Sequence, residues 1–245
     1  MTLPLFLVEP GSLDGRTMVR LDGEEGRHAA VVRRVRVGEQ VELGDGNGTV
    51  ARCAVEGVGR QGLSCRVLEL VEHPPPAPHV VVVQALPKGE RGELAVDLLT
   101  EVGVDEVVPW EAARCVVRWR GEREGRGVGR WRAAAREAAK QSRRARLPEV
   151  TGLSTTEDVG ARLASAHLAL VLQEDAARPI AAVLPPDAGE VVLVVGPEGG
   201  ITPEELEVFE AAGALPVRLG PSVLRTSTAG AVAAGILLAR SPRWS

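Results

Sequence analysis

The chain has 245 residues, of which 44% are hydrophobic and 25% charged, a composition that excludes wholesale disorder and leaves room for two domains. Its formal net charge of −4 argues against a uniformly basic nucleic-acid-binding protein. Three cysteines without C-x-x-C spacing indicate neither a disulfide framework nor a zinc site, and no apolar run approaches the ~20 residues of a membrane span. We therefore expect a cytoplasmic protein with buried, reduced thiols and no metal.

Residues 1–72 have the pattern of a small β domain. Short apolar runs separated by turn residues predict one helix at 24–32 and strands at 17–21, 40–43, 49–55 and 64–70. The sequence Asp-Gly-Asn-Gly at 45–48 is typical of a β-hairpin, and closely spaced short strands favour a small barrel. The proline-rich stretch 73–79 then predicts an extended linker.

From residue 80 the pattern changes to alternating strands and helices. Continuous apolar runs such as Val80–Leu86 are typical of strands buried on both faces of a parallel sheet. Strands are predicted at 80–86, 104–108, 168–172, 191–195 and 215–218, and helices at 94–102, 130–143, 204–212 and 228–238. The predicted fold class is therefore an α/β domain over residues 80–245, preceded by a small β domain.

Two glycine- and proline-containing loops follow the last two predicted strands. The first, Gly196–Glu205, reads G-P-E-G-G-I-T-P-E-E, and the second, Leu219–Ala229, reads L-G-P-S-V-L-R-T-S-T-A. Because ligands bind at the carboxyl ends of strands in open α/β sheets, these paired loops predict a binding site. No Gly-Lys-Ser/Thr follows either strand, so a triphosphate-cradling loop is not indicated.

In each loop, one charged residue has two interpretations. Glu198 lies just before a predicted helix that begins with a capping box, so its carboxylate either serves the positive end of that helix or takes part in chemistry. Arg225 either pairs with a carboxylate such as Glu198, which would join the loops, or contacts a ligand. The hydroxyl residues 226–228 offer a cap for the last helix.

The segment from Arg114 to Arg146 has twelve basic and three acidic residues, a net charge of +9. Such a run is either a solvated helix face or a face that binds a polyanion. Trp119 and Trp131 lie within it and would either stack on bases or anchor the helix in the core.

Motifs over nearly the whole chain resemble those of the RsmE-type 16S rRNA uracil-N3 methyltransferases of the SPOUT class. The two loops carry the most specific part, G-P-E-G-G-I-T-x-x-E and L-G-P-x-V-L-R-T. The other motifs are His28 followed by Val31-Val32-Arg33-Arg34, Lys88-Gly89, Glu101-Val102-Gly103-Val104, Arg114-Cys115, and Glu137-Ala138-Ala139-Lys140-Gln141-Ser142-Arg143-Arg144. One departure is Ser227, which stands where the family often has a glutamate.

The resemblance implies a PUA-like RNA-binding barrel at 1–72, a linker at 73–79 and a SPOUT methyltransferase domain with a deep trefoil knot at 80–245. It further implies a homodimer that uses S-adenosylmethionine to methylate N3 of a specific uridine (U1498-type) in the 16S rRNA of the small ribosomal subunit.

Site residues are carried over from the matching motifs. The implied cofactor-binding residues are Leu172, Gly196, Pro197, Glu198, Gly199, Leu219, Gly220, Val223, Leu224, Arg225 and Thr228. Arg225 would stabilise negative charge on the base, and Glu198 is the candidate proton acceptor. The implied RNA-binding residues are Arg33, Arg34, Arg36, Lys88, Gln141, Arg143 and Arg144.

Two other interpretations remain open from the sequence. A non-catalytic RNA-binding assembly factor would keep the barrel and the basic segment while its cofactor loops are vestigial. A Rossmann-type enzyme acting on a small molecule is disfavoured, because no G-x-G-x-x-G follows an early strand and the basic segment would be unexplained.

Overall fold

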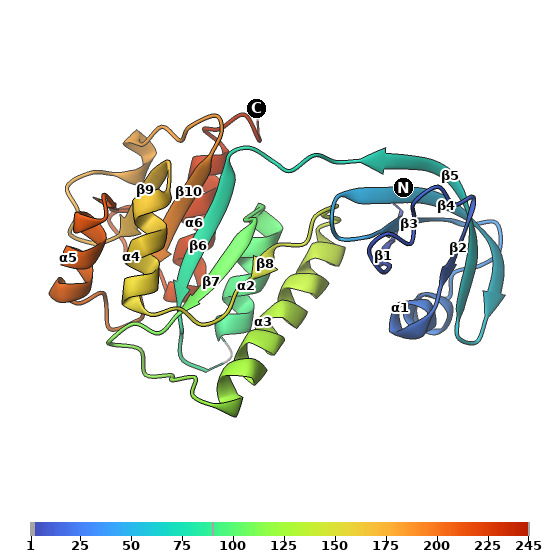
Figure 1. Ribbon diagram of the computed structural model, residues 1–245, viewed down its shortest axis with the longest axis horizontal. Helices are drawn as coiled ribbons and strands as arrows, with labels where there is room; N and C mark the ends of the chain where they lie inside the picture. Colours follow the sequence, from blue (N-terminus) through green and yellow to red (C-terminus); the bar gives the residue numbers. More distant parts are fainter. Residues whose placement is uncertain (1–2, 90, 245) are drawn as a thin grey trace. The chain divides into compact units, whose positions relative to one another are not determined.

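The computed structural model describes residues 3–89 and 91–244 (Figure 1). Contacts divide the chain into a first unit, Met1–Pro75 with Ala139–Leu147, and a second unit, Pro76–Ala138 with Pro148–Ser245. The boundary between Pro75 and Pro76 lies within the predicted linker 73–79, and residues 139–147, expected in the second domain, group with the first unit.

The first unit is built on a five-stranded sheet in the order β1-β3-β4-β5-β2. Its strands are β1 (Leu5–Leu7), β2 (Met18–Leu21), β3 (Gln40–Gly44), β4 (Thr49–Gly59) and β5 (Gly62–Glu72). β1 pairs with β3 in parallel and the other pairs are antiparallel. The hairpin at 45–48 is confirmed: the Asp45 carboxylate accepts the N–H groups of Asn47 and Thr49 at 2.7 and 2.9 Å.

A short helical segment covers this sheet, α1 (Gly23–Arg27) continuing into the π-turn η1 (His28–Val32). A side chain at Gly26 would place its Cβ 2.3 Å from the Leu21 carbonyl oxygen, so α1 can lie directly against the strand end only with glycine there. The buried thiols of Cys53 and Cys65 are unbridged, as expected from the sequence. Burial raises the pKa of Cys53 to about 12 and that of Cys65 to about 11, which keeps both thiols protonated.

Residues 139–147 belong to the first unit because they bind its hairpin and its helix. The Lys140 ammonium lies 2.8 Å from the Glu25 carboxylate, and both side chains are nearly buried. The Leu147 N–H donates to the Gly46 carbonyl at 2.9 Å. These contacts join positions about a hundred residues apart, which no local sequence pattern reports.

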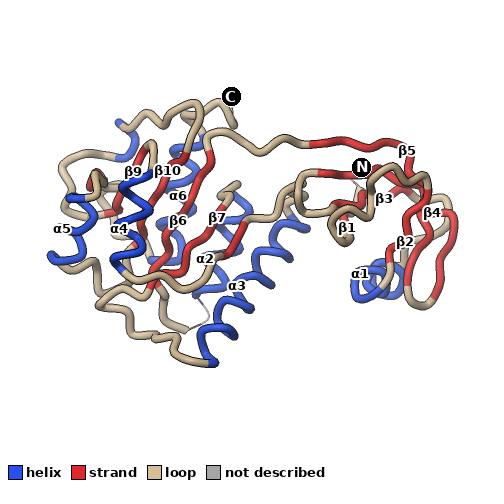
Figure 2. Tube along the Cα trace, in the orientation of Figure 1, coloured by secondary structure: helices blue, strands red, loops and turns tan. Residues whose placement is uncertain are grey.

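The second unit is a parallel six-stranded sheet in the order β11-β9-β10-β6-β7-β8. Its strands are β6 (His79–Ala85), β7 (Glu106–Trp110), β8 (Glu149–Val150), β9 (Leu168–Leu172), β10 (Glu190–Val195) and β11 (Leu215–Val217). Its helices are α2 (Arg91–Val102), α3 (Glu122–Gln141), α4 (Thr156–Ser165), α5 (Pro203–Ala211) and α6 (Thr226–Leu238), and a short 3-10 helix spans Ile180–Ala182. The last turn of α3 groups with the first unit. α2 and α6 pack together on one face, and α4 and α5 pack together on the other (Figures 1 and 2).

The predicted strands and helices of this unit are confirmed, but α4, β8 and the first half of α3 were missed. A signal for α4 is present, since Thr155 and Asp158 form a capping box at its start. β8 has two residues and is too short to show a period. Among the described residues no helix has the length and apolarity needed to cross a membrane.

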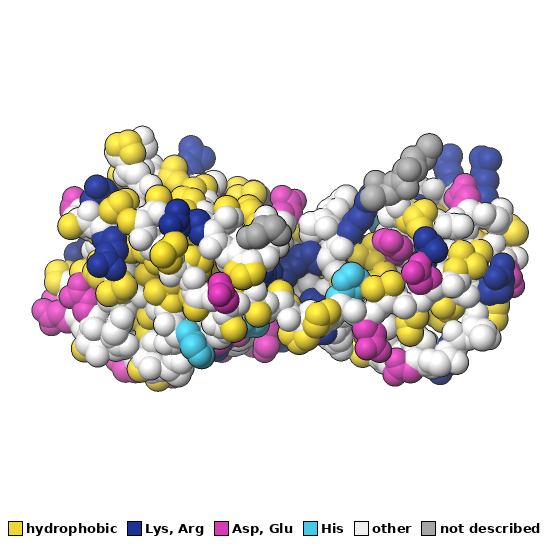
Figure 3. Space-filling model, turned by 90° about the horizontal axis from the view of Figure 1, so that it is seen from above, with side chains coloured by type: hydrophobic (Ala, Val, Ile, Leu, Met, Phe, Trp, Pro, Cys, Tyr) yellow, Lys and Arg dark blue, Asp and Glu magenta, His cyan; other side chains and the backbone are white. Residues whose placement is uncertain are grey.

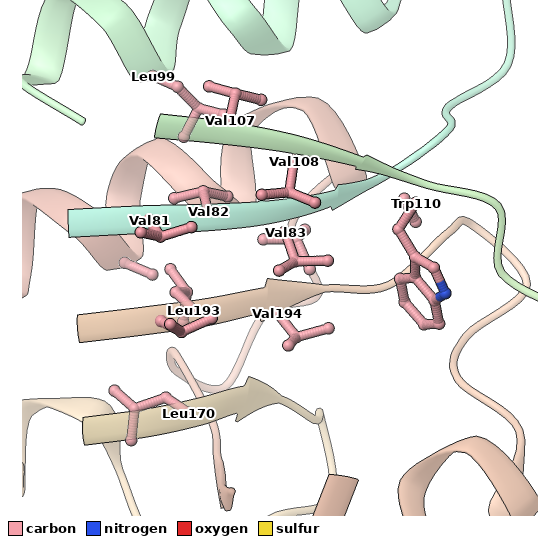
Figure 4. Close-up of a cluster of buried hydrophobic side chains, with 14 of the residues drawn as sticks. Val81, Val82, Val83, Leu99, Val107, Val108, Trp110, Leu170, Leu193 and Val194 are labelled. Carbon is pink, nitrogen blue, oxygen red and sulfur yellow. The ribbon is translucent and has the colours of Figure 1, made fainter. Parts of the chain in front are cut away.

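The core of the second unit is made of valines on both faces of the central strands (Figure 4). Two tryptophans are the largest fully buried side chains, Trp110 and Trp131. The ring of Trp119 packs edge-on against Trp131 with a centroid distance of 5.2 Å. The buried-anchor interpretation of Trp119 and Trp131 is therefore confirmed, since neither ring is exposed enough to stack on a base.

An ionic cluster joins the amino ends of three parallel strands in the second unit. Arg162 of α4 contacts Glu106 of β7 at 2.8 Å and Glu190 of β10 at 2.6 Å, and His79 of β6 lies 3.6 Å from Glu106. The hydrogen bond to Glu106 raises the pKa of His79 despite partial burial. Burial opposes ionisation of Glu106, but the hydrogen bonds from His79 and Arg162 outweigh it and lower its pKa.

This cluster makes the stability of the second unit depend on pH. A raised histidine pKa stabilises the folded state most below the unfolded value of 6.5 and loses this contribution as pH rises through the folded value. We expect the urea midpoint to fall as pH rises from about 6 to about 8, and His79→Gln to remove much of that dependence. His73→Gln, at an exposed histidine, is the control. An unchanged pH dependence in His79→Gln would contradict the assignment.

Candidate ligand-binding site at the strand ends

A pocket of about 780 Å³ lies at the carboxyl ends of β9, β10 and β11 in the second unit. Its walls are residues 172–175 at the end of β9, 195–201 at the end of β10, and 217 and 219–225 at the end of β11, together with Arg114 and the first turn of α6. This is the position where open α/β sheets bind ligands, and the volume suits a molecule of cofactor size.

The wall after β10 is a tight turn held by the start of α5. Thr202 and Glu205 form the predicted capping box, with Glu205 N–H to Thr202 Oγ1 at 3.2 Å and Thr202 N–H to the Glu205 carboxylate at 3.0 Å. A Cβ at Gly196 would lie 2.7 Å from the Ile201 side chain, and Gly200 has φ of 75°. Glycine is therefore required at both positions for this turn.

Glu198 and Arg225 do not form the ion pair that one interpretation of the sequence allowed. The Glu198 carboxylate accepts the Lys88 N–H at 3.2 Å and lies 4.0 Å from the Arg91 guanidinium. Within residues 3–89 and 91–244, the Arg225 side chain has neither an ion pair nor a hydrogen bond. The pocket therefore presents Arg225 as an exposed cation without a carboxylate partner.

The wall after β11 exposes backbone donors. In the described part of the chain, no hydrogen bond is donated by the backbone N–H groups of 219, 220 and 222–225. Two apolar side chains of this loop are exposed, Val223 at 78% and Leu224 at 38%. Apolar surface beside unpaired amides fits a ligand with a flat apolar ring and polar edges, such as a nucleoside.

The hydroxyl cap predicted for α6 is wrong. Arg225 is the N-cap residue and no side chain caps the helix; instead, the Thr228 hydroxyl donates to the Arg225 carbonyl at 3.1 Å. Thr226 and Ser227 are buried. The three hydroxyl residues lie in the first turn of α6, one residue too late to be the N-cap, so the Thr-Ser-Thr pattern alone does not identify the N-cap.

The pocket brings together ten of the eleven residues predicted to bind the cofactor: Leu172, Gly196, Pro197, Glu198, Gly199, Leu219, Gly220, Val223, Leu224 and Arg225. Thr228 does not line it. Other lining residues were missed from the sequence, chiefly Arg114 and the polar run Gln173–Asp175. The run could have been found, because it follows directly on the predicted strand 168–172.

Six of the seven residues predicted to bind RNA lie in the first unit and one, Lys88, in the second. Arg33, Arg34 and Arg36 follow η1. Gln141 is the last residue of α3, and Arg143 and Arg144 follow it. The Lys140–Glu25 ion pair links the second group to α1, which continues into η1 and from there into the first group.

Comparison with known proteins identifies relatives over the whole chain. Residues 74–238 match the RNA methyltransferase domain family, and residues 21–68 match the RNA methyltransferase PUA domain. The ribosomal RNA small subunit methyltransferase E of Mycobacterium bovis is 52% identical over 248 aligned residues, covering 100% of this chain and 94% of that protein. That of Bacillus subtilis is 30% identical, covering 85% of each chain.

Two solved structures extend this similarity. A ribosomal RNA small subunit methyltransferase E from Neisseria gonorrhoeae, solved bound to S-adenosyl methionine, superposes with a TM-score of 0.87 at 25% identity, covering 97% of each chain. A protein from Legionella pneumophila, solved with bound SAM, has a TM-score of 0.84 at 30% identity, covering 98% of this chain and 99% of that one. The chain therefore belongs to the RNA methyltransferase family, of the RsmE type with a PUA-like N-terminal domain.

Proposed function

We propose that this protein is an S-adenosylmethionine-dependent methyltransferase that modifies N3 of a specific uridine in the 16S rRNA of the small ribosomal subunit. One observation carries the proposal: ten residues assigned from family motifs in three separate segments line a single pocket. The relatives named as small-subunit methyltransferases support the substrate class, and the SAM-bound relatives support the cofactor.

The residues of the pocket fit S-adenosylmethionine. Leu172, Ile201, Leu219 and Leu224 would pack against the adenine, and the backbone N–H groups of 219, 220 and 222–225 would donate to its polar edge and to the ribose. When bound, the cofactor supplies an electrophilic methyl group. The glycine turn at 196–200 holds the wall in place, so the pocket orients its ligand with little rearrangement of its own.

Methylation at N3 of uracil requires loss of the N3 proton, and negative charge then accumulates on the ring oxygens. The Arg225 guanidinium would donate its forked N–H groups to a uracil oxygen as that charge develops. Glu198 is the candidate proton acceptor. Its carboxylate already accepts the Lys88 N–H, which would hold it in one orientation.

We further propose that the protein is a cytoplasmic homodimer whose C-terminal domain carries the trefoil knot of its family. Large apolar side chains of the second unit are exposed, Val116 at 74%, Val223 at 78% and Val232 at 44%. Apolar side chains also gather on the face of this unit seen at the left of Figure 3. Exposed apolar side chains of this kind support an interface with a second copy.

Backbone geometry supports the RNA-binding assignment. Arg34 and Arg143 both have positive φ, 54° and 56°, and both follow the end of a helical segment. Glycine or asparagine is favoured at such positions, and an arginine there costs on the order of 1 kcal/mol. An arginine side chain kept at this cost is consistent with a role in binding.

Charge reversal at the end of α3 tests that assignment. We expect Arg143→Glu with Arg144→Glu to weaken binding to small ribosomal subunits and to reduce the slope of log affinity against log salt, because about one counterion is released per phosphate contact. Filter binding over a KCl series measures both quantities, and Arg178→Ala, at an exposed arginine of the second unit, is the control. Unchanged affinity for the subunits would show that these arginines lie on a solvated face and do not bind RNA.

The non-catalytic alternative differs in cofactor binding. Calorimetric titration of the full chain with S-adenosylmethionine is expected to give saturable heat. A vestigial site would give none, and the protein would then be an RNA-binding assembly factor.

A further inference from the structure

Glu205 is a buried carboxylate, 5% exposed, that does more than complete the capping box of α5. One of its oxygens accepts the Thr202 N–H at 3.0 Å. The other accepts the Ala113 N–H at 2.7 Å and the Thr156 hydroxyl at 3.4 Å. The carboxylate therefore joins the turn after β10 to the loop after β7.

Arg114, next to Ala113 in that second loop, lies on the pocket wall and is exposed. Its guanidinium donates to the Gly199 carbonyl at 3.0 Å. On its other side, Cys115 is buried and its N–H donates to the Ala112 carbonyl at 3.0 Å. The backbone is thus fixed on both sides of Arg114, while most of the guanidinium donors remain exposed.

We propose that Arg114 contacts a phosphate of the RNA substrate and that Glu205 is the residue that positions it. The inference rests on the proposed function for its substrate class. Arg114 lies at the rim of the pocket, since its contacts Gly199 and Gly200 are exposed, whereas Leu172, Val195 and Ile201 line the interior. It is also the first cation of the basic segment 114–146. A rim guanidinium is reached by a polyanion and matches phosphate geometry with its forked donors.

The chemistry of Glu205 explains why a carboxylate stands there. Both of its oxygens accept backbone N–H groups, from Thr202 and from Ala113. An isosteric glutamine would turn its NH₂ toward one of these donors, so one hydrogen bond would be lost and two donors would face each other. Glu205→Gln should therefore release either the turn after β10 or the loop that carries Arg114.

The test compares five full-chain variants with the wild type. These are Arg114→Ala, Glu205→Gln, their double variant, Thr202→Ala and Glu207→Gln. Thr202→Ala removes the helix cap but keeps the bond from Ala113, and Glu207→Gln removes an exposed carboxylate of the same helix. Three quantities are measured: the affinity for purified small ribosomal subunits by filter binding over a KCl series, the affinity for S-adenosylmethionine by calorimetry, and the melting temperature.

We expect Arg114→Ala to weaken subunit binding about tenfold and to reduce the salt slope by about 0.9, with S-adenosylmethionine affinity within about twofold of wild type. Glu205→Gln should weaken subunit binding in the same direction and add less than about a further twofold in the double variant, because both changes act on one contact. Thr202→Ala and Glu207→Gln should leave subunit binding within about twofold.

Three results would overturn the proposal. An unchanged salt slope in Arg114→Ala would exclude the phosphate contact, and an equal loss of cofactor affinity would assign Arg114 to the cofactor carboxylate. Effects of Arg114→Ala and Glu205→Gln that multiply would show that Glu205 does not act through Arg114. If Glu205→Gln does not fold, Glu205→Asp, which is too short to reach both loops, replaces it. A wild type that binds subunits but not S-adenosylmethionine would refute the proposed function alone, since the subunit measurements stand without the cofactor.

Discussion

Replacing Arg225 by alanine is expected to lower the rate of methyl transfer by about 10²–10³-fold, the usual loss when one preorganised donor to a developing charge is removed. Affinity for S-adenosylmethionine should stay within a few fold, because the cofactor would be held by apolar side chains and backbone N–H groups rather than by this cation. Single-turnover transfer of labelled methyl, combined with calorimetry, separates the two effects.

The structural basis is the position of Arg225 on the pocket wall without a carboxylate partner among the described residues. An arginine that joined the two loops would form an ion pair with a carboxylate, and its loss would lower the stability of the fold rather than the rate of methyl transfer. Arg178→Ala is the matched control, since Arg178 is exposed in the same unit and does not line the pocket. Methyl transfer at the wild-type rate in Arg225→Ala would show that the assigned role is wrong.

Replacing Arg243 by alanine is expected to destabilise the second unit by about 3–5 kcal/mol, because it removes the ion-pair partner of the buried Asp105 carboxylate. Arg243 lies 2.5 Å from Asp105, and the two side chains are 12% and 7% exposed. Arg243 also donates to the carbonyls of Pro78 and Gly103 at 3.2 and 2.8 Å, so it pins the C-terminal segment to the amino end of the sheet. The melting temperature should fall by roughly 6–20 °C.

A neighbouring arginine provides the comparison for this effect. Arg240 donates one hydrogen bond, to the Val183 carbonyl at 3.1 Å, and Arg240→Ala should cost only about 1 kcal/mol. Urea unfolding of both variants measures the difference. If Arg243→Ala is no less stable than Arg240→Ala, the ion pair with Asp105 does not stabilise the fold as argued.

The strands of the second unit other than β8 could be predicted because they are mainly apolar runs, such as Val191–Val195, and such runs are typical of strands buried on both faces of a parallel sheet. The turn after β10, which forms one wall of the pocket, could also be predicted from local sequence. Thr202 and Glu205 are a capping box in the sequence and in the structure. By contrast β1 and β8 have three and two residues, and their pairing depends on neighbours far along the chain. The closure of the first sheet into a barrel stays a prediction.

The pocket was predictable only where the family motif supplied the residues. Composition and periodicity place two loops at strand ends, but they do not show that the segment after β9 joins them. Arg114 was missed because it comes from the loop after β7, and its contact with Gly199 spans 85 positions. The bond from Ala113 to Glu205 spans 92 positions. Such contacts are set by sheet order, which the local pattern does not encode.

The measurement that tests the central claim most directly is transfer of labelled methyl from S-adenosylmethionine to small ribosomal subunits that lack the modification. The 16S rRNA is then digested and the labelled nucleoside identified. The proposed function predicts one labelled product, 3-methyluridine, from a single position, and its loss in Arg225→Ala. Label on a different atom or base, or no transfer by a wild type that binds both subunits and cofactor, would contradict it.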